Sequence, residues 1–246
     1  MYNNFTVEFT NERSIPSGGL AVVGAILGKS DFVKRMNRMD VTPNRSQHQI
    51  KNGDILLTYV GMLCMGKSQY EAVHEMDDDP SFYKRALGVA YKIPSEETLR
   101  QRLDDIGASI RSKILAENVE MLRSNGIHPS KIKEGFVPVD SDVSPFDNSK
   151  THKEGVSRTY KGCDGYAPML SYIGAEGYLI NLQLREGSQH SQCGTPEYLR
   201  ETIALCKQVT DEKLLFRLDS GNDATENMGI FLENGCYFNI KHNLRR

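Results

Sequence analysis

Apolar positions in the first half of the chain recur at helical spacing and predict a small bundle of helices. Apolar side chains cover most of a helix surface over residues 54–65, which indicates a buried helix. A second pattern of this kind runs over residues 108–122. Asp79, followed by Pro80, and Ser95 are typical N-terminal caps and predict two further helix starts. Because the segments between these patterns are short, we expect the helices to pack together.

Beyond Gly126 the pattern changes to short apolar runs of the kind found in buried strands. Five strands are expected, at residues 135–143, 167–173, 178–184, 214–219 and 237–240. Helical patterns at residues 196–209 and 224–234 separate the last three of them. The order β-β-β-α-β-α-β predicts a mixed five-stranded sheet with right-handed crossovers. It is also the order of the RNase H-like fold, whose first and fourth strands are neighbours.

The predicted fold class is therefore α/β, with two regions. A helical region, residues 1–130, precedes a partial RNase H-like fold with a mixed five-stranded sheet, residues 131–246. The fold is expected to be partial because no helix follows the fifth strand, where one would normally cover the sheet. We therefore expect exposed apolar surface and poor solubility of the isolated chain.

Two acids end predicted strands that this topology places side by side. Asp142, with Asp140 two residues before it, closes the first strand, and Asp219 closes the fourth. An isolated acid at such a place is commonly a turn residue, as the Asp-Ser-Gly sequence at Asp219 illustrates. Together, however, two acids can share divalent metals that activate water or a hydroxyl against a phosphodiester. The pair indicates a nuclease or polynucleotidyl-transferase core.

Charge and cysteine content limit the other classes of function. The net charge of −2 does not by itself indicate nucleic-acid binding, although local basic patches matter more than the total. Five cysteines, an odd number without a Cys-x-x-Cys pair, argue against a disulfide framework and a zinc site. No apolar run is long enough to span a bilayer and no signal peptide is recognisable, so we expect a cytoplasmic protein without a membrane partner.

Basic residues gather in two places that could contact phosphates. One group lies on a single helical face, and the other follows the first strand directly. The predicted DNA contacts are Lys34, Arg35, Arg38, Lys150, Lys153, Arg158 and Lys161. Either group is equally explained as a solvated surface, and only proximity to a metal site favours the DNA interpretation.

One apparent nucleotide motif is better explained as a helix. Residues 24–30 resemble a phosphate-binding loop but are one residue short of the required spacing, and no strand precedes them. We interpret residues 21–27 as an apolar helix that ends at Gly28.

Five short motifs along the chain are specific in combination. They are Val139-Asp140-Ser141-Asp142-Val143-Ser144, Tyr160-Lys161-Gly162, Leu184-Arg185-Glu186-Gly187-Ser188, Arg217-Leu218-Asp219-Ser220-Gly221 and Ile240-Lys241-His242-Asn243-Leu244-Arg245. Through them the chain resembles bacterial insertion-sequence transposases of the DDE type, specifically the 1380 family. Ser144 in place of Thr, and Asn222 in place of an aromatic residue, are mild departures from that family.

The resemblance implies a function and assigns roles to residues. It implies an RNase H-like core that uses Mg²⁺, or Mn²⁺, to cut DNA at the terminal inverted repeats of the element and join it to target DNA. Asp142 and Asp219 would be the catalytic and metal-binding acids, and Asp140 is the alternative to Asp142. Residues 1–130 would bind DNA, and a homo-oligomer is a further partner to consider.

The third acid of the resembling family has no counterpart in this sequence. That acid is a glutamate on a helix beyond the fifth strand, whereas Glu226 and Glu233 precede the strand. We therefore expect a C-terminally truncated transposase that is inactive alone, unless a downstream reading frame supplies the rest. The alternative is a non-catalytic remnant that binds DNA and inhibits transposition.

Overall fold

A computed structural model describes residues 9, 11, 14–38 and 48–242 of the chain. The chain forms two compact units, Met1–Ala108 and Ser109–Arg246. We expected the division near residue 130, but it falls inside one long helix. The second part of that helix packs with the sheet, which places it in the second unit.

The first unit is built from helices. They are α1 (Leu20–Gly28), α2 (Phe32–Asn37), α3 (Asn52–Cys64), the 3-10 helix η1 (Tyr70–Asp78), α4 (Pro80–Leu87) and the beginning of α5 (Glu96–Ser124). Both predicted caps are present: the Phe82 N–H donates to Asp79 Oδ1 at 3.0 Å, and the Thr98 N–H donates to Ser95 Oγ at 3.4 Å. The two helical patterns beginning at Ser95 and residue 108 form the single helix α5.

The apparent phosphate-binding loop is helix α1, as the apolar pattern predicted. Gly24 lies so close to α4 that a Cβ atom there would be 1.7 Å from the carbonyl oxygen of Ala86. This glycine therefore permits contact between two helices, and its place in a glycine-rich sequence reflects packing.

The second unit contains the predicted five-stranded mixed sheet. Its strands are β1 (Val137–Val143), β5 (Met169–Ile173), β6 (Tyr178–Gln183), β7 (Leu214–Leu218) and β8 (Tyr237–Ile240). Their order across the sheet is β6-β5-β1-β7-β8. β5 runs antiparallel to β1 and β6, whereas β7 runs parallel to β1 and β8. The first and fourth long strands are thus neighbours, and the RNase H-like topology is confirmed.

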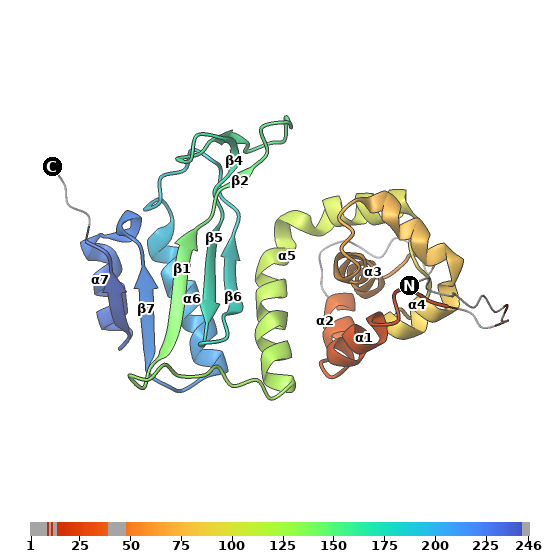
Figure 1. Cartoon of the computed structure of the whole chain (residues 1–246), viewed down its shortest axis with the longest axis horizontal. Helices are drawn as coiled ribbons and strands as arrows, with labels where there is room; N and C mark the ends of the chain where they lie inside the picture. The colour runs from red at the N-terminus through yellow and green to blue at the C-terminus, as the bar shows by residue number, and fades with distance from the viewer. Residues whose placement is uncertain (1–8, 10, 12–13, 39–47, 243–246) are drawn as a thin grey trace, which may run out of the picture. The chain divides into compact units, whose positions relative to one another are not determined.

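Helices cover one face of this sheet. α6 (Thr195–Val209) and α7 (Thr225–Glu233) lie behind the strands in Figure 1. Alternate strand residues point into the core formed with these helices, among them Val139 and Phe216, both fully buried. The second part of α5 contributes Leu115, Val119 and Leu122 to the same core.

α5 also protects the outer edge of β6. Arg111 Nε donates to the carbonyl oxygen of Leu182, and Asn118 Nδ2 donates to that of Leu179, each at 2.6 Å. Because these side chains satisfy backbone groups of the edge strand, they make it a poor template for pairing with another chain.

The opposite face of the sheet carries exposed apolar side chains. Within the second unit, no described helix packs on this face (Figure 1). Tyr172, Leu179, Leu182 and Tyr237 are each more than a third exposed. The poor solubility that such a surface implies stays a prediction.

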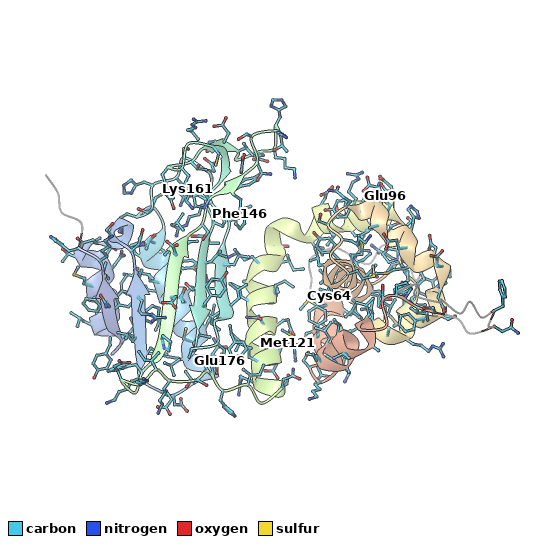
Figure 2. All side chains as sticks on the ribbon, viewed as in Figure 1. Cys64, Glu96, Met121, Phe146, Lys161 and Glu176 are labelled. Carbon is cyan, nitrogen blue, oxygen red and sulfur yellow. The ribbon has the colours of Figure 1, made fainter. Side chains whose placement is uncertain are left out.

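The chain segment that connects β1 to β5 forms a small second sheet, where we expected only a hairpin loop. It consists of β2 (Phe146–Asp147), β3 (Ser157–Arg158) and β4 (Asp164–Tyr166) in the order β2-β4-β3. A Cβ atom at Gly165 would lie 1.8 Å from the carbonyl oxygen of Phe146, so glycine allows these strands to approach. Figure 2 shows Phe146 and Lys161 of this insert at the end of the large sheet opposite Glu176.

Candidate active site

The register of β1 and β7 brings the two predicted acids to adjacent strand ends. Asp140 lies opposite Arg217, and Ser141 lies opposite Leu218, the last residue of β7. One further step in this parallel register places Asp142 beside Asp219. The two acids are thus neighbours at the carboxyl ends of the strands, as the RNase H-like order predicted.

Hydrogen bonds fix the carboxylate of Asp219 at the start of a tight turn. Its Oδ1 atom accepts from the backbone N–H of Gly221 at 3.1 Å and from Nδ2 of Asn222 at 2.6 Å. Asn222 is fully buried, and its carbonyl oxygen accepts from Nδ2 of Asn227 at 2.9 Å. Asn227 is also fully buried and lies on α7. The helix therefore anchors the residue that orients Asp219.

A neighbouring loop is tied to the same turn. Ser191 Oγ donates to the carbonyl oxygen of Gly221 at 2.8 Å, and Gln192 Nε2 donates to that oxygen at 2.9 Å. Arg185, almost fully buried, donates to the carbonyl oxygen of Ser191 at 3.1 Å. Burial lowers the pKa of the Arg185 guanidinium, which lies over the ring of Tyr198, 5.6 Å from the ring centroid. The sequence motif around Arg185 thus serves to hold the wall of the site.

Asp142 is exposed, and its carboxylate contacts the backbone of the next residue. Its Oδ1 atom accepts from the N–H of Val143 at 2.8 Å. The hydroxyl of Tyr160 donates to the carbonyl oxygen of Val143 at 3.3 Å. Partial burial and the charges of Asp142 and Asp219 raise the pKa of Tyr160. One phenol therefore lies within electrostatic range of both acids, a proximity that strand spacing alone did not predict.

Asp140 has a different environment from Asp142. It forms an ion pair with Arg217, and both of its carboxylate oxygens accept hydrogen bonds from that guanidinium. The hydrogen bond to Asp140 raises the pKa of Arg217. A role for Asp140 as a metal ligand stays a prediction, although its oxygens are already engaged by a cation.

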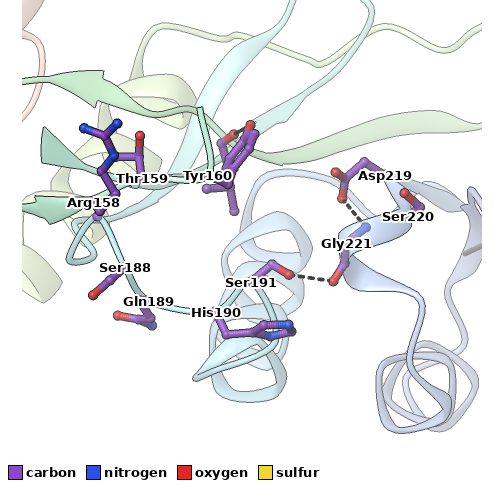
Figure 3. Close-up of a pocket in the computed structure, with 12 residues that line it drawn as sticks. Arg158, Thr159, Tyr160, Ser188, Gln189, His190, Ser191, Asp219, Ser220 and Gly221 are labelled. Atoms are coloured by element: carbon purple, nitrogen blue, oxygen red, sulfur yellow. Dashed lines mark hydrogen bonds between the residues drawn. The ribbon is translucent and has the colours of Figure 1, made fainter. Parts of the chain in front are cut away.

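A cavity of about 520 Å³ lies beside Asp219 (Figure 3). Its walls come from the end of β1, the turn between β3 and β4, the loop after β6 and the turn after β7. The lining residues are Val143, Arg158, Thr159, Tyr160, Gly187, Ser188, Gln189, His190, Ser191, Asp219, Ser220 and Gly221. Sequence reasoning identified Asp219 and Arg158 here but missed Tyr160, whose only signal was its place in a family motif.

The sequence matches one known protein family over nearly its whole length. The family model for the transposase DDE domain, group 1, matches residues 1–244. The chain belongs to this family. Membership confirms the DDE class that the motifs indicated.

Other comparisons add little to the family match. Among solved structures, the DDE domain resembles the piggyBac transposase synaptic complex with hairpin DNA, at 13% identity and a TM-score of 0.38. The match covers 94% of this chain and 51% of that one, so the chain spans about half the length of the piggyBac chain. No curated protein matches the sequence.

The carboxylates of Asp142 and Asp219 fit a divalent metal by the nature of their atoms. Carboxylate oxygens are the ligands that Mg²⁺ prefers, and it commonly binds through one or two carboxylates together with waters and substrate phosphates. Among the described residues, no group of three or more His, Cys, Asp or Glu side chains is placed to hold a metal ion. An ion held by Asp142 and Asp219 would take further oxygens from water or substrate.

The predicted DNA contacts of the second unit lie in the insert near these acids. Lys150, Lys153, Arg158 and Lys161 are all exposed. Arg158 pairs with Asp164 at 3.4 Å, an exposed pair that contributes little to stability and can open for a phosphate. The structure thus brings this basic group to the end of the sheet where the acids lie.

The remaining basic groups lie outside the insert, at α2 and in the C-terminal segment. Lys34 and Arg35 lie on α2 and Arg38 directly follows it; Lys34 is paired with Asp31 at 2.8 Å. Of the basic C-terminal segment 241–246, only Lys241 and His242 are described, so the family motif that includes Asn243, Leu244 and Arg245 lies outside the described residues. None of the described helices is long and apolar enough to cross a membrane.

Proposed function

We propose that this chain is the DNA-cleaving and strand-joining core of an insertion-sequence transposase, of the bacterial 1380 type that its motifs resemble. The observation that carries the proposal is the pairing of Asp142 and Asp219 at adjacent ends of parallel strands, in a chain that belongs to the DDE family. The proposed substrate is DNA at the terminal inverted repeats of the element, together with target DNA.

The residues around the acids have distinct proposed roles. Asp142 and Asp219 bind Mg²⁺ or Mn²⁺, which supplies stabilisation of charge on the attacking and leaving oxygens of a phosphodiester. Asn222 and the Gly221 N–H fix the orientation of the Asp219 carboxylate. Lys150, Lys153 and Lys161 attract the DNA backbone to this end of the sheet. Lys34, Arg35 and Arg38 form a separate proposed DNA contact on the helical unit.

A second proposal is the non-catalytic alternative. Among the residues that the structure describes, no group of three or more His, Cys, Asp or Glu side chains is placed to hold a metal ion. As the alternative to DNA cleavage, we propose that the chain binds element ends without cutting them. In that case the chain competes with a complete transposase for element ends and inhibits transposition.

Nicking of a supercoiled plasmid that carries the element ends tests both proposals. The reaction contains Mg²⁺ or Mn²⁺, and the unmodified chain is compared with Asp142→Ala and Asp219→Ala. Asp211→Ala, which removes an exposed acid from the loop before β7, is the matched control. We expect any nicking to disappear in both site variants and to persist in the control.

Each other result has a definite meaning. Nicking that survives in either site variant would reject the proposed catalytic pair. Absence of nicking, with retained binding in a gel-shift experiment, would support the non-catalytic alternative. Absence of both nicking and DNA binding would reject both proposals.

A further inference from the structure

We propose that the cavity beside Asp219 binds one unstacked nucleotide of the DNA strand, with the ring of Tyr160 as its stacking surface. This inference rests on the proposed function, because it assumes that the substrate is DNA. It adds a binding site for a base to the acids that act on the phosphodiester.

The size of the cavity suits a single nucleotide. Its volume of about 520 Å³ lies within the range of small-molecule sites, roughly 300–1,000 Å³. A stacked helical segment would not enter a space of this size. The walls come from segments that hydrogen bonds hold together, including Ser191 and Gly221, so the cavity exists before any ligand binds.

The ring of Tyr160 is largely exposed, while its hydroxyl is held by the carbonyl oxygen of Val143. The side chain is 70% exposed, and it is carried by a short turn between β3 and β4. That turn is rigid: the Thr159 N–H donates to the carbonyl oxygen of Cys163 at 2.9 Å, and the Gly162 N–H donates to that of Thr159 at 3.0 Å. Thr159 itself is buried and bonds Cys163 through its hydroxyl as well. An aromatic ring held rigidly in solvent is the usual surface on which a base stacks.

The wall across the cavity offers hydrogen-bonding groups to a base edge. Ser188, Gln189 and His190 carry a hydroxyl, an amide and an imidazole, and Figure 3 shows them on the loop that faces the Tyr160 turn. Gln189 is fixed by a hydrogen bond from Nε2 to the carbonyl oxygen of Cys193 at 2.8 Å. Unstacked bases are recognised by this combination of stacking and hydrogen bonds to their edges.

Charge favours a base in the cavity over a free anion. Asp219 lines the cavity and Asp142 is close enough to raise the pKa of Tyr160, so both acids would repel an unpaired phosphate. The uncharged base of a nucleotide avoids that repulsion, while its phosphate can lie toward Arg158 on the rim. A nucleotide next to the bond that the acids act upon would therefore occupy the cavity.

Fluorescence of 2-aminopurine tests this inference without cleavage. The probe is a short duplex with one unpaired 2-aminopurine at its 3′ end, and Ca²⁺ replaces Mg²⁺. Stacking on Tyr160 should quench the probe in the unmodified chain and in Tyr160→Phe, which keeps the ring. Tyr160→Ala should weaken the affinity measured by quenching about 5- to 150-fold, the range expected when one base loses an aromatic partner. Tyr237→Ala, at another exposed tyrosine of the same unit, should bind as the unmodified chain does.

Two further variants separate the site from the chemistry. Asp219→Ala should abolish nicking and retain quenching, so a failure of the proposed catalysis is distinguished from a failure of the base site. Gln189→Ala, on the opposite wall, should weaken quenching without changing the fold. Equal quenching by Tyr160→Ala and the unmodified chain, or loss of quenching in Tyr160→Phe, would overturn the inference. So would equal quenching of a probe whose 2-aminopurine is fully paired within the duplex.

Discussion

Two successive positions on one face of the β1–β7 ladder carry opposite arrangements of charge. At the first, Asp140 lies opposite Arg217 and forms an ion pair with it. At the second, where the strands end, Asp142 and Asp219 place two carboxylates together, and neither acid belongs to an ion pair between described side chains. Two adjacent like charges disfavour each other unless a cation lies between them. Adjacent positions of the β1–β7 ladder thus differ: Asp140 is balanced by a cation of the chain, whereas Asp142 and Asp219 form a pair of like charges that a cation would stabilise.

The largest effect is expected when the Asp142–Asp219 position is given an ion pair like that of Asp140 and Arg217. Asp142→Lys would set an ammonium beside Asp219 and displace any metal, so metal-dependent nicking should fall on the order of 10²- to 10³-fold or more. The stability should change by only about 1 kcal/mol, because the new pair would be exposed. Nicking rates and urea denaturation measure the two effects. Retained nicking in this variant would show that the two acids do not share a metal.

Removing the group that orients Asp219 should have an intermediate effect. Asn222→Ala deletes the amide that donates to Asp219 at 2.6 Å, and loss of such an outer contact typically costs about 10- to 100-fold in metal affinity or activity. Titration of nicking against Mn²⁺ separates this effect from a general loss of folding. Asn234→Ala is the matched control, because its side-chain amide donates to the carbonyl oxygen of Ile230 at the end of α7, away from Asp219. An unchanged Mn²⁺ requirement in Asn222→Ala would mean that this hydrogen bond has no part in metal binding.

Disrupting the ion pair of Asp140 and Arg217 should lower the stability slightly and leave catalysis almost unchanged. Asp140→Asn and Arg217→Ala, combined in a double-mutant cycle, should show a coupling of about 0.2–1 kcal/mol, since both side chains are more than a third exposed. The Mn²⁺ dependence of nicking should stay the same in Asp140→Asn. A weaker Mn²⁺ response would instead place Asp140 among the metal ligands.

The smallest effect concerns the ionisation of Tyr160. Because its pKa in the folded chain is raised above the ordinary 10.0, the proton on the phenol contributes stability below pH 10 that disappears as the pH rises through the higher value. Replacing Asp142 or Asp219 by Asn should lower this pKa, since each acid contributes to the shift. NMR titration of ¹³C-labelled tyrosine identifies the signal by its absence in Tyr160→Phe. A midpoint that is insensitive to both acids would contradict the proximity of the three groups.

Much of the local structure follows from short-range patterns. The caps at Asp79 and Ser95 act within one turn of helix, so neighbouring residues suffice to predict them. The strand β8 was predicted at the residues where it occurs, and the acids of β1 and β7 were recognisable because each ends an apolar run. The three short strands of the insert were missed, because strands of two or three residues leave no alternating pattern to detect.

The sequence by itself determined the order of the five long strands with the helices between them, and it singled out the two acids, since these depend on periodicity and on residues near one another in the chain. Only the tertiary structure decided what surrounds the acids. Asp140 and Arg217 are 77 positions apart, and Asn227 lies on a helix that must pack before its amide can reach Asn222. Tyr160 comes near both acids through a turn that follows two other strands. Such contacts depend on register and on packing between distant segments, and no local pattern encodes either.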